Sequence, residues 1–389
     1  GRMGGSPLLG VQLLVDWVER GVIRAGHDGP VLDGARLSKL PHELDGVWLG
    51  RLARAQAAAA DPDTFRRGVE LAATYGSEVP AEVWDALQQR HALVDIWDAL
   101  SGRGLAAASE DGWRFSHLAF VEAVRREAAR RGRRKALARD CAAALERVSA
   151  KRPFAYAAAL ARLWFEGGEA QRALAPMLRQ SELHRRFDDV ESSREVLERR
   201  AELLDELGFA SNDLERINNT VELLSDILWA SHGAQHIHER AEALLAVLGR
   251  RDAPELRAKV FLILSLSSQR LGDYERARDE AARAHRAACD GAAEHIVARA
   301  LTRRASLAAR TGSRLEAVEL ASDLRQLAQQ LGDIYIAVRA THLEGWAWLS
   351  DGVLDRAEQC LRQVHEEARD HGYARFEGDA LNALGDVAR

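Results

Sequence analysis

The sequence predicts a mainly α-helical protein in which a compact helical module precedes an array of repeated helix pairs. Hydrophobic residues make up 47% of the 389 residues and charged residues 29%, and only 8 are proline, a composition that favours packed helices over disorder. Glycines recur every 40 residues in the second half of the chain. The first half carries a short hairpin signal between helical segments.

Helical segments follow one another through the first 100 residues. Residues 5 to 23 are apolar and expected to form a helix, with Ser6 as N-cap and Pro7 at the first helical position. A loop rich in glycine and aspartate is expected over 26–34. One further helix is expected from Leu40-Pro41 to beyond Leu52, and others over residues 64–75 with Asp61 as cap, 80–90 and 92–100.

A hairpin is predicted where a turn separates two short apolar segments. The turn is Glu110-Asp111-Gly112, between Leu105–Ala107 and Trp113–Phe115. Another helix begins near His117. Three helices, a small hairpin and a following helix resemble a winged-helix domain, which we expect over residues 64–150.

The strongest internal signal is a repeat of 40 residues. Gly272, Gly312 and Gly352 each have an alanine five residues later and a small residue seven residues earlier. The alanines are Ala277, Ala317 and Ala357, and the small residues are Ser265, Ala305 and Gly345, with Gly385 continuing the second series. A further glycine series contains Gly332 and Gly372, with Gly291 one residue out of register.

These offsets describe a helix–turn–helix unit. The small residue lets two helices approach closely, the glycine supplies the positive φ that ends the first helix, and the units must stack to bury their apolar faces. Leu271 to Ala277 resembles the turn of tetratricopeptide repeats. The resemblance covers roughly residues 153–389 and is specific in the last three units. It implies a right-handed tetratricopeptide-like α-solenoid over 151–389, with helix pairs of about 40 residues, continuing beyond Arg389.

Such a solenoid presents an extended concave surface for a protein or peptide. Three aromatic residues in the repeats, Tyr335, Trp346 and Trp348, fit either this surface or the core between the helices.

The order of motifs resembles the C-terminal part of a signal-transduction ATPase with numerous domains, the STAND class. An apolar helix opened by Gly-Ser-Pro-Leu, a Leu-Pro before a helix, and the segment Trp113 to Leu118 carry this resemblance. Bacterial serine/threonine kinases fused to an ATPase and a repeat array are particularly similar. The resemblance implies that residues 1–63 are the end of the ATPase module, its lid helices, and that the parent protein binds ATP or ADP.

In that family a glycine-x-proline motif lies against the adenine, and a winged-helix histidine meets the nucleotide phosphate in the resting ADP state. Gly5 and Pro7, with Ser6 between them, match the first motif, and His117 matches the second. Ser116 and Leu118 depart from the family's usual neighbours of that histidine. Simpler interpretations remain open: a capped helix start at Ser6-Pro7, and a His117 that packs against the hairpin.

The sequence contains no G-x-x-x-x-G-K-[ST] motif, which would cradle phosphates. We therefore expect no cofactor in this chain, no catalytic residue and no ATP hydrolysis, with the phosphate-binding half lying before Gly1. The expected function is a non-catalytic regulatory arm whose array binds a protein or ligand, with self-association or kinase control as output. The alternatives are part of a transcription regulator of the same family, and an enzyme whose active site leaves no motif.

Other candidate chemistry is weaker. Arginines crowd residues 125–139, which fits either phosphate contacts or a solvated helix end, and the net charge of −5 argues against a nucleic-acid partner. His232, His236 and His238 cluster without the further ligands that a metal site needs. The widely spaced Cys141, Cys289 and Cys360 and the lack of a membrane-length apolar run indicate a cytoplasmic protein.

Overall fold

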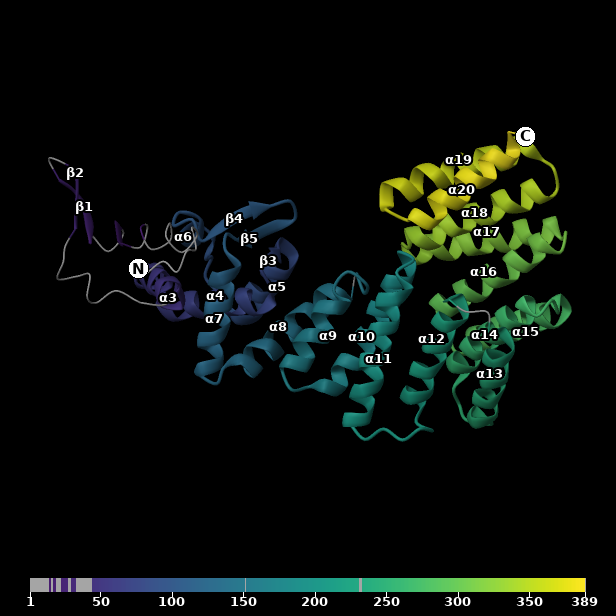
Figure 1. The fold of residues 1–389 in the computed structure, drawn as a ribbon, viewed down its shortest axis with the longest axis horizontal. Coiled ribbons are helices and arrows are strands. Elements are labelled where there is room, and N and C mark those ends of the chain that lie inside the picture. Colours follow the sequence, from purple (N-terminus) through teal and green to yellow (C-terminus); the bar gives the residue numbers. More distant parts are fainter. Residues whose placement is uncertain are drawn as a thin grey trace. The chain divides into compact units, whose positions relative to one another are not determined.

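The computed structural model describes residues 14, 17–18, 22–26, 29–32, 44–150, 152–230 and 233–388 (Figure 1). The chain divides into two compact units, Gly1–Pro176 and Met177–Arg389. The finer boundaries after residues 63 and 150 remain predictions. The N-terminal motif of Gly5, Ser6 and Pro7 lies outside the described residues, as does most of the helix expected over 5–23.

The first unit is helical with two small sheets. Its elements are β1 (Ile23–Gly26), β2 (Gly29–Leu32), α3 (Leu44–Ala57), α4 (Pro62–Tyr75), β3 (Glu78–Pro80), α5 (Ala81–His91), α6 (Trp97–Ser101), β4 (Ala106–Ser109), β5 (Gly112–Phe115), α7 (Leu118–Arg130), α8 (Arg134–Ser149), α9 (Ala157–Glu166) and α10 (Ala170–Arg186), which runs into the second unit.

The predicted hairpin is confirmed and gains a third strand. β5 pairs antiparallel with β4 on one side and with β3 on the other, in the order β3–β5–β4. Trp113 on β5 is buried and meets Trp84 of α5 edge-on at 5.8 Å between ring centroids. Phe115 packs on Phe120 of α7, so the sheet shares one core with the helices on either side of it.

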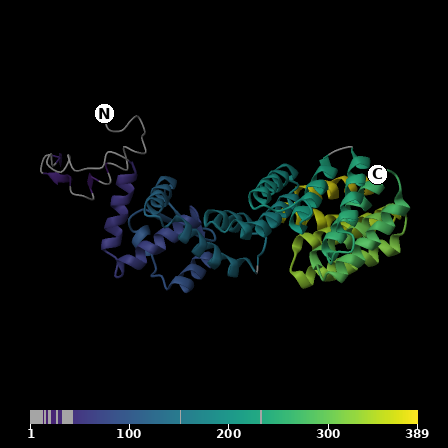
Figure 2. The same ribbon diagram turned by 90° about the horizontal axis from the view of Figure 1, so that it is seen from below.

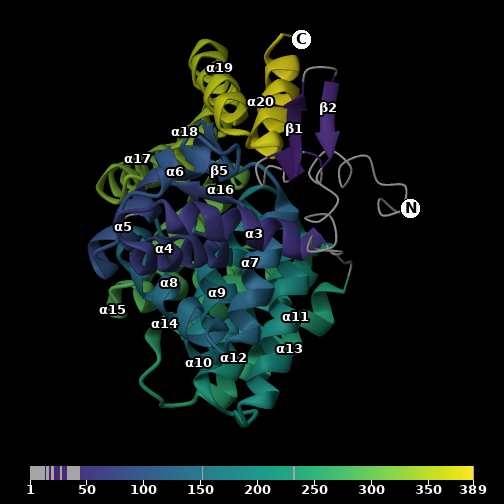
Figure 3. The same ribbon diagram turned by 90° about the vertical axis from the view of Figure 1, so that its left-hand side faces the viewer.

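Local signals explain the good and the wrong predictions in this unit. The side chain of Asp61 accepts from the backbone N–H groups of Asp63 and Thr64, so it caps α4 as predicted. The helix expected over 92–100 is wrong for residues 92–96, because Ala92 takes a left-handed φ of 49° and α6 begins only at Trp97. The loop expected over 26–34 is also wrong in part, since β2 occupies residues 29–32 and pairs with β1, which ends at Gly26 (Figure 3).

The second unit is an array of helix pairs. It contains α11 (Val190–Glu206), α12 (Leu214–Ala230), α13 (Ala234–Leu248), α14 (Pro254–Arg270), α15 (Tyr274–Asp290), α16 (Glu294–Arg310), α17 (Arg314–Leu331), α18 (Ile334–Ser350), α19 (Leu354–His371) and α20 (Ala374–Val387). Each helix packs against the next along the chain from α11 to α20. The predicted fold class is confirmed: mainly α, with a tetratricopeptide-like solenoid. Figure 2 shows these green and yellow helices packed side by side.

The repeat glycines do what the spacing predicted. Gly272, Gly312 and Gly352 have φ of 87°, 79° and 75°, the left-handed conformation that ends a helix at little steric cost. Gly345 instead allows the two helices of its pair, α18 and α19, to pack closely, because a Cβ there would lie 3.2 Å from Cys360 and Leu361 on α19.

Gly291 departs from the second glycine series for a physical reason. The register position is 292, and there Ala292 adopts the left-handed φ of 49°. Gly291 itself has φ −85°, and a Cβ on it would come within 3.2 Å of Pro254 and 3.3 Å of the Glu255 nitrogen. The glycine is therefore needed at position 291, where the backbone lies close to the start of α14, and Ala292 provides the left-handed residue of the turn.

The pairs are α12–α13, α14–α15, α16–α17 and α18–α19, followed by α20. We call α12, α14, α16, α18 and α20 the first helices. Neighbouring first helices contact one another, whereas the described second helices of neighbouring pairs make no comparable contact. The array therefore curves toward its first helices, and we call the surface on that side the first-helix face.

Candidate functional site

The first-helix face carries charged side chains at equivalent places in successive repeats. Lys259, Arg299 and Arg339 follow one another at the 40-residue spacing on α14, α16 and α18. They form a basic row along the face. Four residues earlier on each helix, and so on the same face, lie Glu255, His295 and Tyr335.

Glu222 of α12 is the centre of the charge network on this face. Its carboxylate lies 2.7 Å from Arg185, 3.1 Å from Lys259 and 3.6 Å from Arg299, and only 4% of its side chain is exposed. Burial alone would raise the pKa of Glu222, but the three cations hold that pKa well below its ordinary value of 4.5. Glu222 is therefore an anion that joins α10, α12, α14 and α16.

Asp226 lies one helical turn further along α12, next to Ser225, which is 40 residues before Ser265. The Ser193 hydroxyl donates to Asp226 at 2.6 Å and Arg185 lies 3.3 Å away. Burial raises its pKa despite the nearby Arg185. Asp226 is therefore a second buried carboxyl group beside Arg185.

The end of α10 lies along the face, and its charged side chains pair with charges of opposite sign on the first helices. Arg186 pairs with Asp333, the N-cap of α18, at 2.9 Å, and its guanidinium lies 5.0 Å from the ring centroid of Tyr335. Burial opposes ionisation of Glu182, but Arg299, Arg185 and Arg186 outweigh it and lower the pKa of that carboxyl. Charges far apart in the sequence thus meet on one surface.

Aromatic side chains cluster at the C-terminal end of the first-helix face, on and next to α18 and α20. Tyr335, Tyr373 and Phe376 contact one another at ring-centroid distances of 5.3 to 6.5 Å. His342 packs on Phe376 and accepts a hydrogen bond from the Trp346 indole at Nε2, 2.9 Å away. Burial, together with Arg339 and Arg375, lowers the pKa of His342 to about 3, so its ring is neutral at physiological pH.

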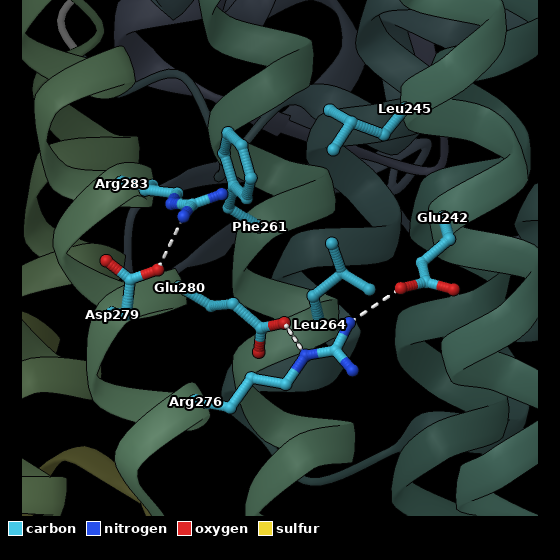
Figure 4. A pocket seen from close by; sticks show the side chains of 8 residues that line it. All are labelled: Glu242, Leu245, Phe261, Leu264, Arg276, Asp279, Glu280 and Arg283. Carbon is cyan, nitrogen blue, oxygen red and sulfur yellow. Dashed lines mark hydrogen bonds and ion pairs between the residues drawn. The ribbon is translucent and has the colours of Figure 1, made fainter.

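A pocket of about 320 Å³ opens between α13, α14 and α15 (Figure 4). Its floor is Phe261 and Leu264, and its rim is charged. Arg276 bridges Glu242 at 2.6 Å and Glu280 at 2.9 Å, while Arg283 pairs with Asp279 at 2.8 Å. Because each arginine here already has a carboxylate partner, the rim offers no unpaired charge to a ligand.

His117, the predicted phosphate contact, is the N-cap of α7 and is half-buried. Its ring lies 5.0 Å from that of Trp48 on α3, and burial followed by the charge of Arg51 lowers its pKa. The structure therefore places His117 beside the ring of Trp48 and close to Arg51. The packing interpretation and the nucleotide interpretation both remain predictions, because the partner motif at Gly5 and Pro7 is not described.

The arginines of residues 125–139 are engaged within the chain. Arg125 donates to the backbone carbonyls of Ala73 and Thr74, and Arg126 pairs with Asp45 at 2.7 Å. The remaining pairs are Arg130 and Arg131 with Glu127, Arg133 with Glu70, Arg134 with Glu166 and Arg139 with Glu169. This pattern is typical of structural ion pairs.

The histidine cluster is only partly described, since His232 lies outside the described residues. His238 is buried and its Nδ1 bonds the Ser267 hydroxyl at 2.8 Å, while His236 is exposed. Within the described ranges, no group of three or more His, Cys, Asp and Glu side chains is arranged to hold a metal ion. No described helix combines the length and apolarity needed to cross a membrane.

The three candidate aromatics fall in different places. Trp348 packs against the core of Ala357 and Leu361, Tyr335 contributes to the first-helix face, and Trp346 is exposed. The contribution of α10 was missed by sequence reasoning. The 40-residue recurrence of Lys259, Arg299 and Arg339 was the available signal for the face.

No protein-family model matches the sequence, and no curated protein does. Solved structures resemble it weakly. A STAND protein with a tetratricopeptide repeat sensor from Pyrococcus horikoshii shares 12% identity at TM-score 0.39, covering 89% of this chain, and this chain spans 61% of that protein.

Two further structures have similar likeness. A Rap protein complexed with competence and sporulation factor matches at 12% identity and TM-score 0.43, covering 80% of this chain and 88% of that one. Aspartyl phosphate phosphatase F from Bacillus subtilis matches at 12% identity and TM-score 0.42, covering 92% and 95%. Likeness at this level carries no conclusion on function, which must come from the chain's own residues.

Proposed function

We propose that this chain is a regulatory protein whose helical array binds a protein or peptide on its first-helix face. One observation carries the proposal: charges are buried on this face where the repeat needs none. Burying an ion pair rarely adds net stability over apolar packing. The pairs around Glu222 and Arg186 are therefore better explained by recognition than by folding.

The face also has the composition of a binding surface. Lysine and arginine form a row, carboxylates face them, and Tyr335 and Tyr373 supply aromatic rings that anchor partners at low entropic cost. Charges and rings spaced along successive helices suit an extended or helical peptide.

We propose in addition that the first unit contains a winged-helix-like module. The order α4, β3, α5, α6, β4, β5 and the sheet order β3–β5–β4 support this assignment. In this proposal the chain is the C-terminal arm of a STAND-type ATPase. The protein would switch between an inhibited and an active state: ADP near the winged-helix-like module favours the inhibited state, and a ligand on the array favours the active one.

Nucleotide contact by His117 belongs to the same proposal. Trp48 and the buried Arg51 beside it supply an aromatic face and a positive charge, which suit a nucleotide phosphate. Gly5 and Pro7 would meet the adenine. The chain itself is expected to hydrolyse no ATP; turnover by the purified chain, abolished by His117→Ala, would contradict a non-catalytic arm.

The output of the parent protein is proposed to be control of a serine/threonine kinase, by analogy with the fusions that the sequence resembles. The alternative is a transcription regulator of the same class, with its DNA-binding domain outside this chain. A kinase catalytic segment encoded upstream favours the first output, and a helix-turn-helix segment downstream favours the second.

The binding proposal is tested by panning a displayed peptide library on the full chain. A face variant, Asp333→Ala with Tyr373→Ala, is compared with a matched variant of two exposed residues on second helices, Asp355→Ala with Tyr274→Ala. We expect enriched peptides to bind the chain and the matched variant but not the face variant. Peptides that bind all three equally, or no enrichment, would overturn the proposal.

A further inference from the structure

The first-helix face is already occupied by a segment of the same chain. Residues 182–189, the end of α10 and the turn into α11, lie along it, and we call them the inner segment. Arg185 reaches Glu222 and Asp226 on α12, and Arg186 reaches Asp333 at the start of α18. The inner segment thus spans the face from its first repeat to its last.

The contacts continue to the far end of the array. The Phe187 ring lies 5.7 Å from that of Tyr373, just before α20, and Asp188 lies 3.6 Å from the guanidinium of Arg375 on α20. The hydrogen bonds and ion pairs described between the inner segment and the first helices are all made by side chains. Side chains that alternate in charge against complementary partners are how a bound peptide is recognised.

We propose that the inner segment is an internal pseudo-ligand, and that the external partner carries the same chemistry: adjacent arginines followed by an aromatic residue on a helical or extended peptide. The inference rests on the proposed binding function and names its ligand class. Glu222, Asp226 and Asp333 select the arginines, and Tyr335 and Tyr373 select the aromatic ring. A partner therefore binds by displacing residues 182–189.

Local features make this displacement feasible. Pro176 lies inside α10, where it removes a backbone hydrogen bond and weakens the helix just before the inner segment. The boundary between the two compact units falls at Pro176 and Met177. At the other end Asp188 holds a left-handed φ of 60°, which is strained for a residue with a side chain. The inner segment is thus flanked by a weakened helix and a strained turn.

Phe187 shows why the inner segment can be exchanged. Phe187 is 49% exposed although its ring contacts that of Tyr373. An anchor that is only half covered leaves apolar area for a partner whose aromatic residue seats more deeply. The inner segment therefore covers only part of the apolar surface that a partner could bury on this face.

The test uses the full chain and a fluorescent peptide with the sequence of residues 179–191. Arg186→Ala with Phe187→Ala releases the inner segment, and Arg194→Ala with Glu198→Ala, an exposed pair on α11, is the matched control. Because occupancy by the inner segment lowers apparent affinity by the fraction of open molecules, we expect the released variant to bind the peptide roughly tenfold tighter or more. The control should bind as the unaltered chain does.

Three further measurements keep the result unambiguous. Adding Asp333→Ala to the released variant should remove most of the gain, and a peptide with both arginines replaced by alanine should not bind. In the unaltered chain, saturating peptide should increase hydrogen exchange of residues 182–189, which tests displacement without any variant. Equal affinity of the released variant and the unaltered chain, or no change in exchange on binding, would overturn the inference.

The library experiment separates this inference from the binding proposal. Face-dependent peptides that contain Arg-Arg-aromatic support both. Face-dependent peptides without that motif would overturn the pseudo-ligand and leave the binding function standing. Absence of any face-dependent peptide, with the released variant included in the panning, would overturn both.

Discussion

Two glutamates that contact the same lysine provide a sharp test of the charge network. Glu222 and Glu255 lie 3.1 Å and 3.2 Å from the Lys259 amine, but their side chains are 4% and 44% exposed. Glu222 also faces Arg185 and Arg299. The two pairs therefore have almost equal geometry and very different burial.

We expect Glu222→Gln to lower the free energy of unfolding of the array by about 3 kcal/mol, because it leaves buried cations without their anion. Glu255→Gln removes an exposed partner, which typically contributes less than about 0.5 kcal/mol. Hydrogen exchange along a urea gradient, read on peptides from α12 to α16, measures the array separately from the first unit.

The pH dependence has a definite sign. The pKa of Glu222 is lowered in the folded chain, so its contribution is complete above the ordinary value of 4.5 and is lost as the pH falls toward the folded pKa. The difference between the unaltered chain and Glu222→Gln should therefore be constant near neutral pH and shrink below pH 4.5. Equal effects of the two substitutions at pH 7 would refute the argument that burial decides.

Four other substitutions are predicted to change stability. His342, with a pKa lowered to about 3, stays neutral in the folded chain, while in the unfolded chain it binds a proton near pH 6.5. The stability of the array should therefore fall as the pH drops below 6.5. In thermal melts, the melting temperature of His342→Phe should depend less on pH over this range. Gly345→Ala should destabilise the array by about 1 kcal/mol, because the added Cβ meets Cys360 and Leu361 at 3.2 Å. Gly378→Ala, where no atom lies within 4 Å, should stabilise it by up to about 1 kcal/mol in the same urea assay; equal signs for the two glycines would contradict the packing argument. Asp61→Ala should cost the first unit about 1 kcal/mol through the lost cap, seen as early fraying of α4 by hydrogen exchange.

The repeat could be predicted because its determinants are local. A left-handed turn needs glycine at a fixed place, and close helices need small residues, so Gly272, Gly312 and Gly352 appear in the sequence at constant spacing. Where a different residue meets the same need, as Ala292 does, the sequence signal shifts by one although the backbone keeps its register. The three-residue strand β3 left no signal because its pairing partner lies in β5.

The face was harder to predict because its determinants are non-local. Arg186 and Asp333 are 147 residues apart, and neither differs in type from the many solvated charges of the other helices. Buried and exposed glutamates look identical in sequence, as Glu222 and Glu255 show. Only folding reveals which charges the helices bring together.

The inner segment is part of the chain that it contacts, and this has a quantitative consequence. A tethered competitor acts at an effective concentration that dilution does not change, on the order of millimolar for a short connection. An external peptide must exceed that competition before occupancy of the face changes. The strength of the Arg185 and Arg186 contacts would then set a detection threshold, so a weakened inner segment should make the protein respond to less ligand rather than to a different one.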